Sequence, residues 1–359
     1  MALPEITITF RKLAEDIVKR SQRGIVALLL EDSTSTEVKT IISRAGDIDA
    51  TKWTAANAAL IKLAFSSGAN KVVVLRLTKT ESTINYDTEI DKIVPMKWNW
   101  LTAPGADAAG VAAIVTKIKA LRADGKTYKA VLANAAAPDS EGIVNFCQTG
   151  SITSDCEGTS AEMTAGAYTV RLAGIFAGLP LDQSALGVAF TDISALTETT
   201  APGTDAAAGK LVMVNNGENY ELASAITSLT TTSASAPEDF KKIKLVEAAD
   251  MIAEDITAIW RAGYRGKKNN DYAGKQSLMA ELTAYLKGIA GTALSPDYAN
   301  AAMIDTDAQS AYLTDAGKDV SLMTDVQIAH ADTGDKVFAK CDIKLIDAME
   351  SISMSVVLQ

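Results

Sequence analysis

Residues 24–30 read GIVALLL, an unbroken apolar run near the start of the chain. A run of this length without alternation predicts a strand that is buried on both faces of a sheet. Helical patterns follow at 53–67 and 111–123, where apolar side chains recur three and four positions apart. Further strands are predicted at 72–77, 98–102, 129–133, 143–146 and 210–214. Strands that alternate with helices indicate α/β crossover units around a largely parallel sheet.

The pattern changes at Pro237, where it becomes helical. Ser235 and Glu238 are spaced as a capping box, which predicts that a helix begins there. A helix of small residues is predicted earlier, at 161–177. After Pro237 we predict helices at 237–262, 272–287 and 305–316, and strands at 322–329, 337–346 and 350–358.

These changes of pattern also divide the chain into domains. The α/β alternation begins at Gly24 and stops before Pro237, so we expect the α/β domain to be an insertion into an α+β domain whose sheet is built from both chain ends. The predicted parts are an N-terminal arm with the start of the α+β domain at 1–22, the α/β domain at 23–236, the rest of the α+β domain at 237–348, and a C-terminal strand arm at 349–359.

Both ends of the chain alternate polar and apolar residues. Residues 6–10 read ITITF and residues 352–358 read ISMSVVL. A period of two predicts strands with one apolar face, formed by Ile6, Ile8 and Phe10 at one end and by Ile352, Met354, Val356 and Leu358 at the other. Terminal segments are usually polar, so these apolar faces require burial. Each strand either completes the chain's own sheet or adds to the sheet of a neighbour by strand augmentation.

Composition excludes several classes of function. The chain has 359 residues, enough for about two domains. Its net charge of −10 argues against nucleic acid as a partner, because phosphate binding needs a basic surface. A single histidine excludes sites built on two imidazoles, and three cysteines without C-x-x-C spacing exclude a zinc ribbon. The start does not resemble a signal peptide and the apolar runs are too short to span a membrane, so we expect folding in a cytoplasm and no membrane insertion.

Motifs of enzymes and cofactor sites are incomplete. Gly125-Lys126-Thr127 resembles the end of a P-loop, but Ala120 stands where the first glycine belongs, and no G-x-G-x-x-G opens a helix. We therefore expect no cofactor, no metal site and no enzymatic activity. His330 is either a catalytic base or a solvated histidine at a strand end. An α/β enzyme or ligand-binding protein that uses residues 24–150 remains an alternative, although the polar residues after its strands form no recognisable catalytic set.

One stretch of the chain is clearly basic. Five cations stand against Asp271, while the last 60 residues hold ten acidic and four basic residues. Such self-complementary charge suits head-to-tail assembly of identical chains, and a phosphate site or a plain solvated loop are the alternatives. The cations are Arg261, Arg265, Lys267, Lys268 and Lys275.

Several segments, in order, resemble a known family. Residues 169–180, TVRLAGIFAGLP, followed by Gln183-Ser184, resemble the "AGI.AG.P…S" segment of contractile tail sheath proteins, as found in contractile phage tails and R-type bacteriocins. Residues 243–270 are similar to the family's "R..D.I..DI…F…Y.GK..N" segment, although Lys244 and Leu245 depart from its basic start. Residues 342–352 resemble the "D.mE.i" ending. The opening arm and residues 21–30 match the family's arm and its "RGI" strand.

The resemblance implies a mechanical protein rather than an enzyme. Subunits of this family stack as hexameric rings around a tail tube, with an inner domain toward the tube and an outer domain toward solvent. Arms from both chain ends add strands to neighbouring subunits, and contraction drives the tube through a cell envelope. The implied partners are other sheath subunits, the tube protein, and baseplate and tail terminator proteins.

The resemblance also implies a place of action and a tube contact. We expect assembly in the bacterial cytoplasm into a phage tail or bacteriocin particle that is later released. By similarity to the family's tube-attachment helix, the helix at 305–316 is expected to face the tube through Asp305, Asp307 and Asp315. A strand-swapped homo-oligomer that does not contract remains an alternative.

Overall fold

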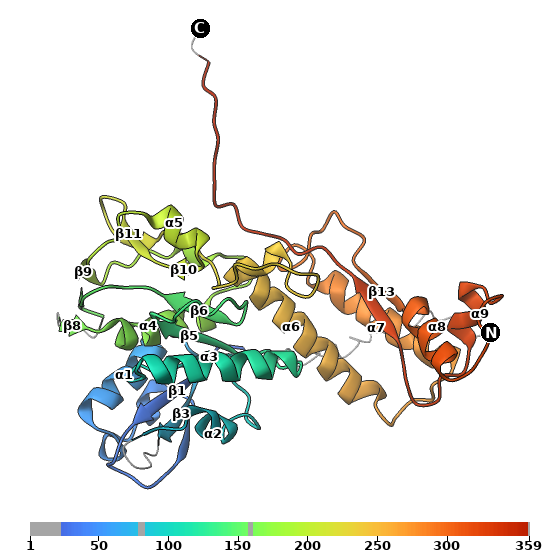
Figure 1. Cartoon of the computed structure of the whole chain (residues 1–359), viewed down its shortest axis with the longest axis horizontal. Coiled ribbons are helices and arrows are strands. Elements are labelled where there is room, and N and C mark those ends of the chain that lie inside the picture. The colour runs from blue at the N-terminus through green and yellow to red at the C-terminus, as the bar shows by residue number, and fades with distance from the viewer. Residues whose placement is uncertain (1–22, 78–82, 157–160, 358–359) are drawn as a thin grey trace, which may run out of the picture.

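The computed structural model describes residues 23–77, 83–156 and 161–357. Figure 1 shows an elongated molecule, with a sheet and its helices toward one end and α6, α7, α8 and α9 toward the other. The last residues run away from the body as an extended chain. The fold is a mixed α/β architecture with one parallel-rich sheet and several small antiparallel sheets.

The large sheet has seven strands in the order β10-β6-β5-β4-β1-β3-β2. Six of them run parallel, and only the edge strand β2 (Lys39–Ile42) is antiparallel to its neighbour. The predicted buried strands are confirmed, and 210–214 is divided between two strands. The parallel strands are β1 (Ile25–Glu31), β3 (Lys71–Leu77), β4 (Trp100–Thr102), β5 (Lys129–Ala133), β6 (Ile143–Phe146) and β10 (Lys210–Leu211).

Helices cover both faces of this sheet, which explains the unbroken apolar run in β1. Val26, Leu28 and Leu30 point into one core, with α1 (Ala55–Ser66) and α4 (Ala165–Gly178). Ile25, Ala27 and Leu29 point into the other core, with α2 (Tyr86–Asp91) and α3 (Ala108–Ala123). Alternate side chains of a strand face opposite sides, so a strand between two helical layers needs apolar residues at every position.

The small residues of α4 allow it to lie close to α1. A Cβ at Gly174 would lie 2.6 Å from Ser67 Cβ and 2.7 Å from the Ala64 carbonyl oxygen, so no larger residue fits without movement. The helix predicted at 161–177 therefore exists, but it begins at Ala165, because 161–163 form a short strand.

Two small antiparallel sheets accompany the large sheet in this half of the molecule. One three-stranded sheet contains β7 (Ile152–Ser154), β8 (Ala161–Met163) and β9 (Ile193–Ala195), and a hairpin contains β11 (Met213–Asn215) and β12 (Tyr220–Leu222). The remaining helical turns in this half are Ala45–Asp47, Ala50–Lys52, Ala185–Gly187 and α5 (Pro202–Ala207).

The other half of the molecule is built on two long helices around a third core. α6 (Ile243–Ile259) continues through a π-helical turn, Trp260–Tyr264, toward α7 (Tyr272–Gly288). β13 (Ala301–Ile304) packs on α7 and pairs antiparallel with β14 (Ala339–Asp342). α8 (Thr306–Asp315) and α9 (Asp325–His330) stand between these two strands in the chain.

Two predictions in this half are wrong. Residues 322–329 are not a strand, because Thr324 and Gln327 form a capping box that begins α9. The predicted capping box at Ser235 is not formed; a 3₁₀ turn, Glu238–Lys241, precedes α6 instead. Residues 350–357, predicted as a terminal strand, pair with no other strand in the described part of the chain, which agrees with the alternative in which they add to a neighbour's sheet.

Candidate assembly surfaces

From Ser351 onward, the described part of the predicted C-terminal arm (349–359) is a free, largely apolar segment. Ile352, Met354 and Val356 are 84%, 73% and 72% exposed. Over 351–357 the described chain makes no hydrogen bond or ion pair with the rest of the molecule. These residues therefore do not complete the chain's own sheet. Leu358 of the predicted C-terminal face, and Ile6, Ile8 and Phe10 of the predicted N-terminal face, lie outside the described residues.

The β13–β14 ladder is the second feature relevant to assembly. Its register pairs Ala301 with Asp342 and Ile304 with Ala339. Within the described ranges it holds only these two strands, so each has an edge not paired with a third strand. β14 is largely exposed, whereas β13 lies against α7. An unpaired strand edge is a template for an added strand.

The basic loop between α6 and α7 is exposed. Arg261, Arg265, Lys267 and Lys268 all lie at the surface, on the π-helical turn and the loop that follows it. The fifth predicted member, Lys275, is instead buried inside α7, where its Nζ donates to the Ala331 carbonyl oxygen at 3.2 Å. Burial lowers the pKa of Lys275. The surface cluster is therefore four cations.

The predicted acidic helix forms at the end of the molecule farthest from the large sheet (Figure 1). Asp305 accepts a hydrogen bond from the Ala308 backbone N–H at 3.1 Å and caps α8. Asp307 is exposed and lies 3.4 Å from Lys340, and Asp315 is exposed at the last turn. Only Asp307 and Asp315 are thus available for a partner, since Asp305 has a structural role.

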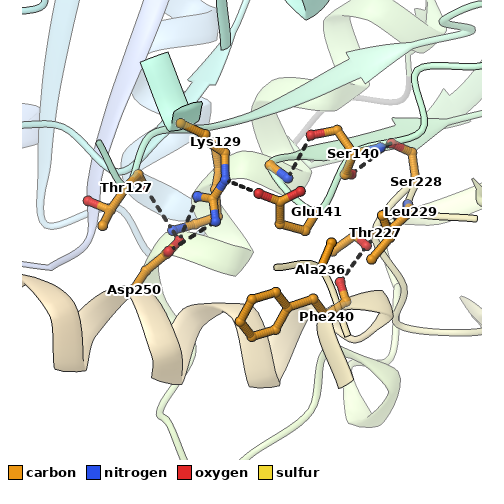
Figure 2. Close-up of polar contacts among 12 residues, drawn as sticks. Thr127, Lys129, Ser140, Glu141, Thr227, Ser228, Leu229, Ala236, Phe240 and Asp250 are labelled. Atoms are coloured by element: carbon orange, nitrogen blue, oxygen red, sulfur yellow. Dashed lines mark hydrogen bonds and ion pairs between the residues drawn. The ribbon is translucent and has the colours of Figure 1, made fainter. Parts of the chain in front are cut away.

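A buried cluster of charges joins the large sheet to α6, and the sequence analysis missed it. Lys129, on β5, is almost fully buried and donates to Asp250 of α6 at 2.6 Å (Figure 2). Its Nζ also lies 3.1 Å from Glu247. Arg122 binds Asp250 with two hydrogen bonds at 3.1 and 3.2 Å, and Arg23 binds Glu247 at 2.6 Å. We refer to these residues as the junction cluster.

In the junction cluster, each charged group stabilises the charged form of its partners. Burial disfavours the charged form of Lys129, but Asp250 and Glu247 outweigh this effect and raise its pKa. Burial alone would raise the pKa of Glu247, but Lys129 and Arg23 lower it below its ordinary value. Buried ions in such a network stay charged because each has an opposite charge in contact.

Backbone contacts reinforce this junction beside the charges. The Thr227 hydroxyl donates to the Phe240 carbonyl oxygen at 2.8 Å, and the Thr227 N–H donates to the Lys241 carbonyl oxygen at 2.7 Å. Ser228 bonds to Ser140 in the same region (Figure 2). The segment before α6 is thereby tied to the large-sheet half of the molecule.

The structure offers little for catalysis. His330 ends a helix, not a strand as predicted, and stacks on Tyr272 with ring centroids 3.6 Å apart. Burial raises the pKa of the Cys147 thiol to about 11, which keeps it protonated and unreactive. Across residues 23–77, 83–156 and 161–357, no three side chains of the metal-binding types come together. No helix in these ranges is long and apolar enough to cross a membrane.

Comparison with known proteins decides the family. The family model described as phage tail sheath C-terminal domain matches residues 235–359. The tail sheath protein of Clostridium phage phiCD119 is 34% identical over 362 residues, covering 99% of this chain and 99% of that protein. The chain belongs to the phage tail sheath family. Tail sheath proteins are structural and not enzymatic, so the predicted family and the predicted lack of enzymatic activity are confirmed.

Solved structures of a sheath and of a baseplate contain chains that share the fold. The anti-feeding prophage helical sheath in its contracted state is similar with a TM-score of 0.69 and 14% identity, over 100% of both chains. A chain of the anti-feeding prophage baseplate, six-fold symmetrised, is similar with a TM-score of 0.66 and 12% identity, over 100% of this chain and 99% of that one. At these identities the likeness establishes a sheath fold and not the details of assembly.

Proposed function

We propose that this sheath protein polymerises as stacked hexameric rings around a tail tube, with neighbours linked by exchange of N- and C-terminal strands, and that contraction drives the tube through a cell envelope. The exposed, unpartnered C-terminal arm is the observation that carries this proposal. The three described side chains of its alternating apolar face, Ile352, Met354 and Val356, gain about 1.5–3 kcal/mol each when fully buried. These side chains are exposed in a monomer, and docking of the arm on a neighbouring subunit would bury them and stabilise the polymer.

The β13–β14 ladder supplies an acceptor for such an arm. Each residue pair of an added strand contributes backbone hydrogen bonds with a net value of about 1 kcal/mol each. The alternation of residues 352–356 lets one face pack on the acceptor while serines face outward. Because the donor and the acceptor lie on the same chain, identical copies link into a continuous mesh.

The same proposal assigns the domains and partners. Residues 23–236 form the outer domain, and 1–22 with 237–348 form the inner domain toward the tube. The separation of α8 from the large sheet along the molecule's long axis supports this orientation (Figure 1). Asp307 and Asp315 then face the tube protein, and the exposed cations at 261–268 contact acidic surfaces of adjacent subunits. Further partners are the baseplate and the tail terminator, in a particle assembled in the bacterial host cytoplasm and then released.

Deletion of residues 351–359 tests the proposal. In the monomer residues 351–357 are exposed and make no hydrogen bond or ion pair with the rest of the molecule, so the deletion should shift the melting temperature by no more than about 2 °C. Electron microscopy of the full chain should show striated hollow cylinders, and the deleted chain should show none. A large fall in melting temperature of the monomer, or normal cylinders without the arm, would contradict strand exchange.

A further inference from the structure

The chain segment that leads to the C-terminal arm is held first by backbone hydrogen bonds and then by side-chain contacts. Between β14 and the arm, the Ser295 N–H donates to the Lys344 carbonyl oxygen at 2.8 Å, and the Ile346 N–H donates to the Ala293 carbonyl oxygen at 3.1 Å. Leu345 forms an isolated antiparallel bridge with Leu294 between them. Beyond Ile346 the described chain makes no further backbone hydrogen bond to another segment. Any control over the arm's direction after that point must come from side chains.

Two acidic side chains make that next contact, and both reach the same lysine. Lys242 Nζ lies 2.7 Å from Glu350 Oε2 and also binds Asp347. The Ser184 hydroxyl donates to Glu350 Oε1 at 2.7 Å. Burial disfavours the charged lysine, but the hydrogen bonds to Asp347 and Glu350 outweigh it and raise the pKa of Lys242. Every described residue after Glu350 is exposed.

We propose that Lys242, Asp347, Glu350 and Ser184 form a clamp that sets the direction in which the C-terminal arm leaves the subunit, and so positions it for docking on the neighbour. This inference rests on the proposed strand exchange. We call these four residues the arm clamp. It gives the two acidic positions of the "D.mE.i" ending a role in assembly. It does the same for Ser184, which within the fold also accepts a hydrogen bond from the Leu186 N–H at 3.3 Å.

The position of the arm clamp fits this role. Ser184 lies in the loop after α4, in the large-sheet half, whereas Lys242 is the residue before α6. The arm therefore leaves from the point where the two halves meet, next to the first turn of α6 (Figure 1). A hinge at 347–350 without these contacts would let the arm sample many directions. Fixing a binding segment near its bound direction reduces the entropy lost on docking.

The ion pairs of the arm clamp are partly exposed to solvent. The side chains of Lys242 and Asp347 are 35% and 37% exposed, and that of Glu350 is 20% exposed. Ion pairs with this much solvent contact are individually weak and are screened by salt. The clamp therefore biases the arm without locking it.

The test compares full-length variants with the arm-deleted chain. Lys242→Gln removes the cation, and Lys241→Gln is the matched control, because Lys241 pairs at 3.0 Å with Glu238 and not with the arm. The charge swap Lys242→Glu with Glu350→Lys should restore the pair. We expect Lys242→Gln to raise the critical concentration for sheath formation by roughly 2- to 30-fold, from the loss of two partly exposed ion pairs. Dispersed subunits of that variant should keep the melting temperature of the parent, and NMR relaxation should show greater backbone mobility at 347–350.

Each outcome separates the clamp from the strand exchange. If Lys242→Gln assembles like the parent while the arm-deleted chain does not, the clamp is refuted and strand exchange stands. If the arm-deleted chain also assembles, the proposed function fails as well. A swap that does not return assembly to within about twofold of the parent assigns Lys242 a purely structural role and overturns the clamp. So does a fall in the melting temperature of Lys242→Gln without greater backbone mobility at 347–350.

Discussion

Replacing Lys129 by methionine should destabilise the subunit, because the lysine is the cation between two buried carboxylates. Its side chain is 2% exposed and lies 2.6 Å from Asp250 and 3.1 Å from Glu247. Removing one partner of a buried pair costs about 3–5 kcal/mol. Arg122 still binds Asp250 in the variant, so we expect the free energy of unfolding to fall by about 3 kcal/mol, the lower end of this range.

Thermal and denaturant unfolding of dispersed subunits measure this loss. A cost of about 3 kcal/mol corresponds to a fall in melting temperature of roughly 6–12 °C for a domain of ordinary size. Lys52→Met is the matched control, because Lys52 pairs with Glu37 at 3.0 Å with both side chains over 40% exposed. The free energy of unfolding of the Lys52→Met control should fall by less than about 1 kcal/mol. A Lys129→Met variant as stable as the parent would refute the view that the junction cluster holds the two halves together.

The same cluster predicts how stability depends on pH. The pKa of Glu247 is lowered in the folded chain, so its contribution is present above the unfolded value of 4.5 and is lost as pH falls through the lower folded value. The pKa of Lys129 is raised, so its contribution is present below the unfolded value of 10.5 and is lost as pH rises through the higher folded value. Lys129→Met should flatten the acid side of the stability profile, and an unchanged profile would contradict the coupling.

Three further predictions follow from features described above. Gly174→Ala should cost about 1–3 kcal/mol in a denaturant melt, because the new methyl group meets the backbone of α1; a neutral result would mean that the two helices separate easily. Asp307→Lys with Asp315→Lys should reduce co-purification of the tube protein while sheath polymers still form, and unchanged co-purification would exclude α8 as the tube contact. Arg265→Glu with Lys268→Glu should raise the critical concentration for assembly most strongly at low salt, as light scattering would show; an effect equal at all salt concentrations would rule out a charge contact.

Much of the large sheet could be predicted from local pattern. Residues 25–30 contribute to two cores at once, and that requirement leaves an apolar run that is visible in the sequence. The helix at 305–316 was predicted within one residue at each end, because Asp305 is a good cap at its start. At 322–329 the apolar pattern predicts a strand, but the capping box from Thr324 to Gln327 begins a helix there.

The contacts between distant segments could not be predicted in this way. Lys129 and Asp250 are 121 positions apart, and neither lies in a pattern that distinguishes it from a surface charge. The arm clamp is similar, since Lys242 meets Glu350 across 108 positions. Alternation predicts the arms, charge predicts the basic loop and the helical pattern predicts the helix at 305–316. The family resemblance suggests roles for the arms and for this helix. None of these signals shows which charges are buried.

A polymer linked through the C-terminal arm has no built-in stopping point. If each subunit lends its arm to the next and accepts one from the previous, every added copy presents the same donor and the same open edge as the one before. Contacts of this head-to-tail kind propagate indefinitely unless the geometry closes into a ring. The number of stacked layers is then not a property of this chain. Sheath length has to be measured by something else in the particle, such as a companion polymer of defined length or a cap that blocks the last free edge.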